Sequence, residues 1–232
     1  MKLLSIVMPV YNEEGWVSEA VRRVMAEETP LEKELVIVDD CSTDATPDRL
    51  EEIGRRYGPS VRVFRHRRNL GKGAALRTGF RKVNGDVVLV QDADLEYSPS
   101  DYDRLLAPIL DGRADVVYGT RFGGEVHRVL FFWHYVGNRF LTTLSNMFTN
   151  LNLTDMEVCY KVFRREVLEG IRIRSNRFGF EPEITAKMAR RKVRLYEVPI
   201  SYAGRDYSEG KKVNWKDGVK AIGAILFFHC FD

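Results

Sequence analysis

Three carboxylates, Asp92, Asp94 and Glu96, lie at alternate positions directly after an apolar run in the middle of the chain. The run itself, Val87–Val90, is rich in β-branched residues and predicts a buried strand. Alternate side chains of an extended segment point to one side, so this acidic cluster could face one point. Clustered carboxylates repel one another unless a cation is present, and hard oxygen ligands suit Mg²⁺ or Mn²⁺, which also bind substrate phosphates. A solvated turn would show the same spacing, but the position after a buried strand favours a metal site.

The elements that would position the acidic cluster alternate between apolar runs and helical patterns. Strands are predicted over Leu3–Val10, Glu34–Val38, Val61–His66, Asp86–Val90 and Asp115–Gly119. The helices between them cover Glu13–Glu28, a segment starting near Pro47, Ala74–Val83 and a segment starting near Ser98. This alternation indicates parallel βαβ units in an α/β sheet, where ligands bind beyond the carboxyl ends of the strands. Tyr11, Asp39 and Arg121 also follow predicted strands, so we expect them on the same edge.

Two polar, glycine-containing segments interrupt the second half of the chain, and both carry cations. Residues 122–128 end at Arg128, and residues 203–214 contain Arg205 and Lys211. We expect both segments to be mobile loops, and arginines beside a diphosphate would bind its phosphates. Solvated loops are the plainer alternative. The remaining elements are predicted as helices over Val129–Phe148, Glu181–Arg191 and Trp215–Phe228, and strands over Val158–Phe163 and Val193–Val198.

Length, charge and cysteine content limit the classes of protein to which this chain can belong. The chain has 232 residues, enough for one sizeable domain, and its net charge of +3 gives no bulk attraction to nucleic acid. Its cysteines are scattered without metal-type spacing, which fits a reducing compartment. Met1–Val10 runs directly into a predicted strand, so we expect no signal peptide. Val129–Phe148 would bury several polar side chains if it spanned a bilayer, so we expect no spanning helix.

Several motifs occur in order along the chain and together resemble one protein family. They read MPVYNEE from Met8, VDDCSTD from Val38, GKGAALRTGF from Gly71, QDADLEYSP from Gln91, GTRF from Gly119, TDMEVCYKVFRREV from Thr154, FGFEPEITAKMAR from Phe178 and RDYSEGKK from Arg205. This series resembles the family 2 glycosyltransferases, and within them the dolichyl- and polyprenyl-phosphate sugar synthases. The resemblance extends to about residue 220.

The resemblance implies the GT-A fold, in which a Rossmann-like, mostly parallel α/β sheet is flanked by helices. It further implies a single catalytic domain over residues 1–232. The nucleotide-sugar-binding half would be 1–121, the acceptor-side half 122–214, and an amphipathic, apolar C-terminal helix would cover 215–232.

The resemblance also implies an activity, the transfer of one sugar, with inversion, from a nucleotide-sugar to a lipid phosphate. The expected donor is UDP-glucose or GDP-mannose, the acceptor a polyprenyl or dolichyl phosphate, and the cofactor Mg²⁺ or Mn²⁺. No nucleic acid partner is expected. The enzyme is expected to be cytoplasmic and peripheral on the cytoplasmic face of the membrane, and its oligomeric state stays open.

By the same resemblance, individual residues take individual roles. Nucleotide contacts are expected from Pro9, Tyr11, Glu13, Asp39, Lys72, Asp92 and Ala93. The metal is expected on Asp94, with Asp92 and Glu96 beside it, and the acceptor phosphate is expected on Arg121 and Arg128. The catalytic set is Asp94, Arg121, Asp155, Arg205 and Lys211. Arg205 and Lys211 would close over the donor diphosphate and the acceptor phosphate, which excludes water and stabilises the leaving group.

Asp155 leaves two enzyme hypotheses open. Many family members place a general base there, and a soluble or polysaccharide hydroxyl acceptor would need one. A lipid phosphate is already an anion and needs no proton removed, so Asp155 could instead bind the sugar or hold Lys161 or Arg164. A non-catalytic nucleotide-sugar-binding protein is a third hypothesis, although the intact acidic cluster and basic segments argue against it.

Two further features also have two interpretations each. The Gly71–Gly73 turn could border the nucleotide phosphates or only cap the following helix; it lacks the remaining residues of a Walker loop. Val129–Phe148 and Ala221–Phe228 could belong to the core, but a lipid-phosphate substrate favours helices that dock on a membrane surface.

Overall fold

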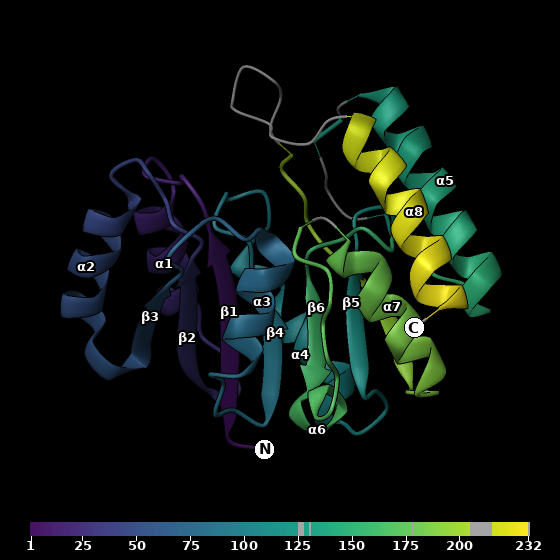
Figure 1. Ribbon diagram of the computed structural model, residues 1–232. Helices are drawn as coiled ribbons and strands as arrows, with labels where there is room; N and C mark the ends of the chain where they lie inside the picture. Colours follow the sequence, from purple (N-terminus) through teal and green to yellow (C-terminus); the bar gives the residue numbers. More distant parts are fainter. Residues whose placement is uncertain (125–127, 130, 178, 205–214, 232) are drawn as a thin grey trace.

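A seven-stranded mixed sheet forms the centre of the computed structural model, which describes residues 1–124, 128, 129, 131–177, 179–204 and 215–231 (Figure 1). The strand order is β3-β2-β1-β4-β6-β5-β7. The strands are β1 (Leu3–Val10), β2 (Glu32–Asp39), β3 (Val61–Arg65), β4 (Val87–Val90), β5 (Val116–Thr120), β6 (Lys161–Arg164) and β7 (Leu195–Pro199).

Helices cover both faces of this sheet. The α-helices are α1 (Val17–Ala26), α2 (Thr46–Tyr57), α3 (Lys72–Phe80), α4 (Tyr102–Leu110), α5 (Phe132–Thr149), α6 (Arg165–Leu168), α7 (Phe180–Arg190) and α8 (Trp215–Cys230). In Figure 1, α3 and α7 lie in front of the sheet and α4 lies behind it. The expected α/β architecture with a mostly parallel sheet is therefore confirmed.

The position of β1 explains why one edge of the sheet can assemble a site. It pairs in parallel with β2 on one side and β4 on the other, so its carboxyl end lies between theirs. Only β6 runs antiparallel to its neighbours β4 and β5 among the described strands. The β4 residues are wholly buried, as their continuous apolar sequence predicts for a strand covered on both faces.

Element boundaries differ from the expected ones where polar side chains bind the backbone. The first helix begins at Val17 rather than at Glu13. Asn12 adopts a left-handed φ of 52°, and the Glu13 amide donates to Thr46 Oγ1, so this stretch forms a turn. The expected strand over 158–163 is shorter and later, at Lys161–Arg164, where it pairs with β4 and β5.

Helices α5 and α8 lie side by side at the end of the sheet that carries β7, beyond α7 (Figure 1). Large apolar side chains on α5 face outward: Trp133 is 77 % exposed, Met147 75 % and Phe140 56 %. Among the helices described, none is long and apolar enough to cross a bilayer.

Candidate functional site

The acidic cluster lies in the loop after β4, but its members take separate partners. Asp92 pairs with Lys72, Glu96 accepts the Tyr202 hydroxyl at 2.9 Å, and Asp94 Oδ1 accepts the Glu96 amide at 3.2 Å. The loop turns at Leu95, whose φ is 62°, so strand alternation does not continue beyond β4. Within the described ranges, no three histidine, cysteine or acidic side chains gather as a metal-binding group.

The three carboxylates therefore do not converge as strand alternation suggested, although their roles as metal ligands stay a prediction. The donor set still fits a divalent cation that is held partly by substrate. Mg²⁺ commonly uses one or two carboxylates together with substrate phosphates and water. Asp92 also pairs with Lys72, so an ion held by the acidic cluster would lie beside a fixed positive charge.

Lys72 bridges two carboxylates at the first turn of α3. Its Nζ lies 2.9 Å from Asp92 Oδ1 and 3.3 Å from Glu181 Oε1. Burial opposes the charge, but Asp92 and Glu181 outweigh it and raise the pKa of Lys72 well above its ordinary value. Lys72 thus carries a permanent positive charge beside the acidic cluster.

The glycine turn before α3 is fixed by packing and by one buried carboxylate. Gly71 has a φ of 99°, and Asp40 accepts the amides of Leu70 and Gly71. A Cβ on Gly71 would collide with the carbonyl oxygen of Asn176. The turn therefore positions Lys72 by capping the helix; a contact with nucleotide phosphates stays a prediction.

The nucleoside side of the predicted site is formed by the ends of β1 and β2. Asp39 is buried, and its Oδ1 accepts the Ser42 amide at 2.9 Å. Among the described residues, none donates a hydrogen bond to its Oδ2, although Arg65 Nε lies 3.0 Å away without suitable hydrogen-bond geometry. A buried carboxylate oxygen in this state is a candidate acceptor for a ligand N–H or hydroxyl. Strand pairing places Pro9 opposite Val38 at the same edge.

Three other predicted nucleotide contacts lie on the loops at this edge. Tyr11 follows β1 and is 40 % exposed. Glu13 is buried next to it, and Ala93 is buried between Asp92 and Asp94.

Arg121 and Asp155, predicted from distant parts of the sequence, form one buried ion pair. Arg121 Nε lies 2.6 Å from Asp155 Oδ2, and Nη2 lies 2.7 Å from Oδ1. Asp155 is 0 % exposed. Burial raises the pKa of Asp155, but Arg121 outweighs it, so the carboxyl pKa lies below its ordinary value. Arg121, rather than Lys161 or Arg164, is thus its partner, and the pair makes Asp155 a weak proton acceptor.

Glu197 on β7 holds the backbone next to this ion pair. The sequence analysis did not predict this role. Its carboxylate accepts the amides of Thr154 and Asp155 at 2.8–3.1 Å. Burial raises the pKa of Glu197 despite these hydrogen bonds. The sequence of β7 does not predict this role, because a lone glutamate in a strand usually faces solvent.

Tyr202 joins the acidic cluster to the Arg121–Asp155 pair, and it too was missed. Its hydroxyl donates to Glu96, and the Arg121 guanidinium carbon lies 5.2 Å from its ring centroid. Arg128 lies along the same segment, since its amide donates to the Tyr202 carbonyl at 3.0 Å and its Nη1 to the Gly204 carbonyl at 3.2 Å. The predicted contacts of Arg205 and Lys211 lie outside the described residues.

Removing the Tyr202 hydroxyl is expected to lower activity without unfolding the protein. Tyr202→Phe keeps the ring beside Arg121 but deletes the hydrogen bond to the Glu96 carboxylate, a bond worth about 1.5–3 kcal/mol. We expect kcat/KM for the sugar transfer that the sequence predicts to fall about tenfold or more. Tyr196→Phe, a change on the exposed side of β7, is the matched control. Equal kcat/KM for the two variants would contradict a role for the Tyr202 hydroxyl.

A buried group of carboxylates lies behind the site and was also unexpected. Glu181 Oε2 and Glu157 Oε1 are both inaccessible, and neither accepts a hydrogen bond from the part of the chain that the structure describes. Burial, reinforced by Glu181, raises the pKa of Glu157 to about 8. Lys161 is fully buried nearby, and its Nζ donates to the Met156 carbonyl at 3.0 Å. Burial lowers the pKa of Lys161 against the pull of these carboxylates.

The raised pKa of Glu157 predicts a particular dependence of stability on pH. Between the ordinary carboxyl pKa of 4.5 and about 8, the folded state holds a proton that the unfolded state releases. The free energy of unfolding should therefore fall as pH rises through this window, by at most about 1.4 kcal/mol per pH unit. Urea titrations at several pH values should show a flatter dependence for Glu157→Gln. The same slope in both proteins would contradict the assignment.

Several known proteins are similar in sequence to this chain. The undecaprenyl-phosphate 4-deoxy-4-formamido-L-arabinose transferase of Edwardsiella ictaluri is 30 % identical over 213 residues, which cover 91 % of this chain and 63 % of that protein. The corresponding transferase of Pseudomonas fluorescens is 34 % identical over 215 residues, with 90 % and 59 % covered. The low-salt glycan biosynthesis hexosyltransferase Agl6 of Haloferax volcanii is 29 % identical over 227 residues, with 96 % and 53 % covered. The chain thus spans about three-fifths of the length of these relatives.

Solved structures share the fold. Glucosyl-3-phosphoglycerate synthase from Mycobacterium tuberculosis, in complex with Mn²⁺, UDP and phosphoglyceric acid, matches with a TM-score of 0.76 and 20 % identity. The match covers 100 % of this chain and 80 % of that one. A family model described as glycosyl transferase family 2 matches residues 5–172. With most of the sheet and the whole acidic cluster inside that match, the chain belongs to glycosyl transferase family 2.

Proposed function

We propose that this chain transfers one sugar, with inversion, from a nucleotide-sugar to a polyprenyl phosphate. The observation that carries the proposal is the buried Arg121–Asp155 pair. A carboxylate held this way, with a lowered pKa, is poorly suited to deprotonate a hydroxyl acceptor. A phosphate acceptor needs no such base, and the names of the bacterial relatives, undecaprenyl-phosphate sugar transferases, point to the same class of acceptor.

The donor is proposed to be UDP-glucose or GDP-mannose, bound across the ends of β1, β2 and β4. The buried Oδ2 of Asp39 would accept a hydrogen bond from the base or ribose, with Tyr11 packed near the base and Pro9 and Glu13 lining the edge. Lys72, Asp92 and Ala93 would border the diphosphate. The charge on Lys72 supports this placement, because a diphosphate gains from a fixed cation.

Asp94, with Glu96 and Asp92 nearby, is proposed to hold Mg²⁺ or Mn²⁺. When bound, the ion would neutralise charge on the diphosphate. Arg121 and Arg128 would bind the acceptor phosphate, and Arg205 and Lys211 would add positive charge near the leaving group.

The chemical step is a single displacement. A phosphate oxygen of the acceptor forms a bond to the anomeric carbon from the face opposite the diphosphate. The bond from that carbon to the diphosphate oxygen breaks, and its electron pair leaves with the nucleoside diphosphate. The Arg121–Asp155 pair would keep the acceptor phosphate aligned for this attack.

The acceptor's tail implies contact with a membrane, which we place on α5 and α8. Helices α5 and α8 pack against each other, and both carry exposed apolar side chains. These are Trp133, Phe140 and Met147 on α5, and Leu226 and Phe227 on α8. Such helices can lie in the interface of a bilayer. We therefore propose a single GT-A domain that lies peripherally on the cytoplasmic face of the membrane. Residues 1–121 would bind the donor, residues 122–214 would bind the acceptor, and residues 215–232 would form the apolar C-terminal helix.

The test compares two acceptors that differ in one group. The protein is incubated with radiolabelled UDP-glucose or GDP-mannose, Mn²⁺, and either a short polyprenyl phosphate or the prenol of the same length. We expect label in the lipid fraction with the phosphate alone, and its loss with EDTA or in Asp94→Ala. Transfer to the prenol, or to a polysaccharide with loss in Asp155→Asn, would favour the hydroxyl-acceptor enzyme. Donor binding without any turnover would favour a non-catalytic binding protein.

A further inference from the structure

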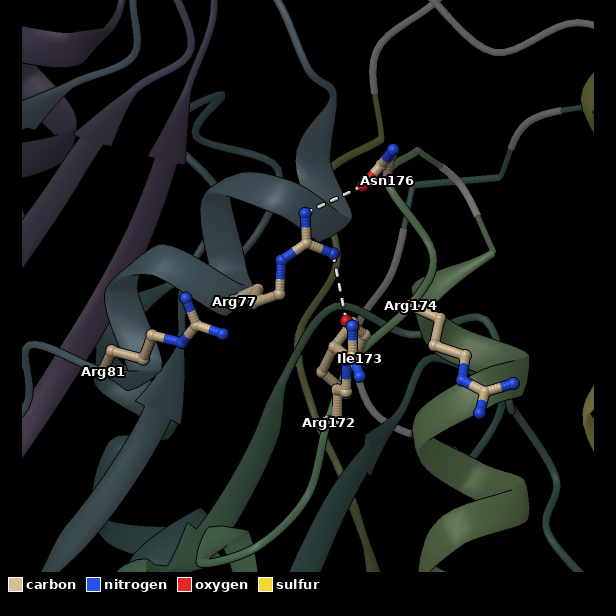
Figure 2. A pocket seen from close by; sticks show the side chains of 6 residues that line it. All are labelled: Arg77, Arg81, Arg172, Ile173, Arg174 and Asn176. Atoms are coloured by element: carbon tan, nitrogen blue, oxygen red, sulfur yellow. Dashed lines mark hydrogen bonds between the residues drawn. The ribbon is translucent and has the colours of Figure 1, made fainter. Parts of the chain in front are cut away.

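A cavity of about 500 Å³ opens between α3 and the segment that leads into α7, away from the acidic cluster. Its lining residues are Arg77, Arg81, Arg172, Ile173, Arg174 and Asn176. Figure 2 shows that Arg77 lies on α3 and Arg81 directly follows its last residue, whereas Arg172 and Arg174 come from the facing segment. Arg77 and Arg81 lie five and nine residues beyond Lys72, about 7 and 14 Å along the helix. The cavity is therefore separate from the proposed donor site.

The positive charge of this cavity is not neutralised by its own lining. No carboxylate is among the lining residues. In the part of the chain that the structure describes, the side chains of Arg81 and Arg172 have no ion pair or hydrogen bond. Glu183 of α7 accepts the amides of Arg174 and Ser175 at 2.7 Å and pairs with Lys187. Arg77, Arg81 and Arg172 bring like charges to the lining of one cavity, and an anion bound there would relieve their repulsion.

One arginine of the cavity is held in place before any ligand arrives. Arg77 Nη1 donates to the Ile173 carbonyl at 3.0 Å and Nη2 to Asn176 Oδ1 at 2.9 Å (Figure 2). These bonds fix the guanidinium plane and tie α3 to the facing segment. A fixed guanidinium suits phosphate, whose oxygens accept two parallel N–H groups.

A second cavity of about 510 Å³ adjoins the first, and several of its lining residues are apolar. We call this second cavity the apolar half. It shares Arg77, Arg81, Arg172 and Ile173 with the first cavity. Its further lining residues are Phe80, Val83, Arg165, Leu168, Glu169, Gly170 and Ile171. Both volumes lie within the usual range of small-molecule sites, and apolar walls with a few charged groups are typical of such sites.

We propose that these two cavities form a second, non-catalytic binding site for a molecule that carries phosphate on an apolar body. The phosphate lies among Arg77, Arg81 and Arg172, and the apolar body lies against Phe80 and Leu168. The same chemistry could come from a free phosphate compound or from a lipid phosphate. The proposal rests on this lining alone and does not depend on the proposed sugar transfer.

The test is calorimetric titration of the intact protein in EDTA with two probes, inorganic pyrophosphate and geranyl diphosphate. The test variant is Arg81→Gln with Arg172→Gln, two exposed positions whose change should leave the fold intact. The control is Arg49→Gln with Arg56→Gln, an equal loss of charge on the distant helix α2. We expect the test variant to weaken both probes at least tenfold and the control less than twofold.

The affinities of the two probes distinguish the sources of phosphate. Geranyl diphosphate should bind at least tenfold more tightly than pyrophosphate, because it alone fills the apolar half. Equal affinities would overturn the apolar part of the assignment. Unchanged binding in the Arg81, Arg172 variant would overturn the site itself. Loss of binding only in Lys72→Gln would do the same, by assigning both probes to the donor site.

Discussion

Asp155→Asn is expected to lower both the stability and the activity of the protein, because Asp155 is the buried partner of Arg121. Its carboxylate is inaccessible and contacts the guanidinium at 2.6 and 2.7 Å. Removing one member of a buried ion pair costs about 3–5 kcal/mol of unfolding free energy. Denaturant unfolding should show a loss near that range. Transfer to polyprenyl phosphate should fall about 100-fold as Arg121 loses its orientation.

Two further variants separate this account from general-base catalysis. The double variant Asp155→Asn, Arg121→Gln should regain part of the stability without regaining activity, because no charge is left buried alone. Asp111→Asn weakens the exposed pair with Arg113 and should cost less than about 1 kcal/mol. A stable Asp155→Asn protein whose activity loses its dependence on pH would instead show that Asp155 acts as a base.

Lys72→Gln is expected to weaken nucleotide binding about 100-fold, which corresponds to about 2.7 kcal/mol. Lys72 supplies the cation between Asp92 and Glu181, so its loss leaves two carboxylates beside the incoming diphosphate. Titration with UDP and with GDP, the leaving groups of the two proposed donors, measures the effect.

The matched control for this experiment is Lys82→Gln, which removes an exposed cation just beyond the other end of α3. Its nucleotide affinity should remain within twofold of the native value. If Lys72→Gln bound UDP and GDP as tightly as the control does, the diphosphate would have to lie elsewhere.

The edge of the sheet could be predicted because it depends on local patterns. Continuous apolar runs identified the buried parallel strands, and the rule that ligands bind at their carboxyl ends brought Tyr11, Asp39 and the acidic cluster to one side. The same rule placed Arg121 there, and the family motifs then added Asp155. None of this required knowledge of how the second half of the chain packs.

What could not be predicted depends on contacts between distant residues. The pairing of Arg121 with Asp155 joins β5 to the segment before β6 through an antiparallel insertion in the sheet. Tyr202 reaches Glu96 across more than a hundred positions of sequence. The divergence of the acidic cluster follows from the turn at Leu95, because the period-two rule holds only while the backbone remains extended.

The burial of charged residues could not be predicted from the sequence either. Lysine and glutamate usually lie at the protein surface, yet Lys161 and Glu181 are almost inaccessible to solvent here. Each is close to other charges, and this proximity exists only in the folded chain. A charged residue inside an otherwise apolar run, such as Lys161 in the β6 motif, is the one sequence signal that could have suggested it.

The most direct test of the central proposal is the structure of the product. Unlabelled donor and short polyprenyl phosphate are converted with Mn²⁺, and the lipid product is examined by ³¹P and ¹H NMR. We expect a sugar phosphodiester, with coupling between phosphorus and the anomeric proton and an anomeric configuration opposite to that of the donor. A sugar attached through a hydroxyl oxygen, or retention of the donor configuration, would contradict the proposed displacement by a lipid phosphate.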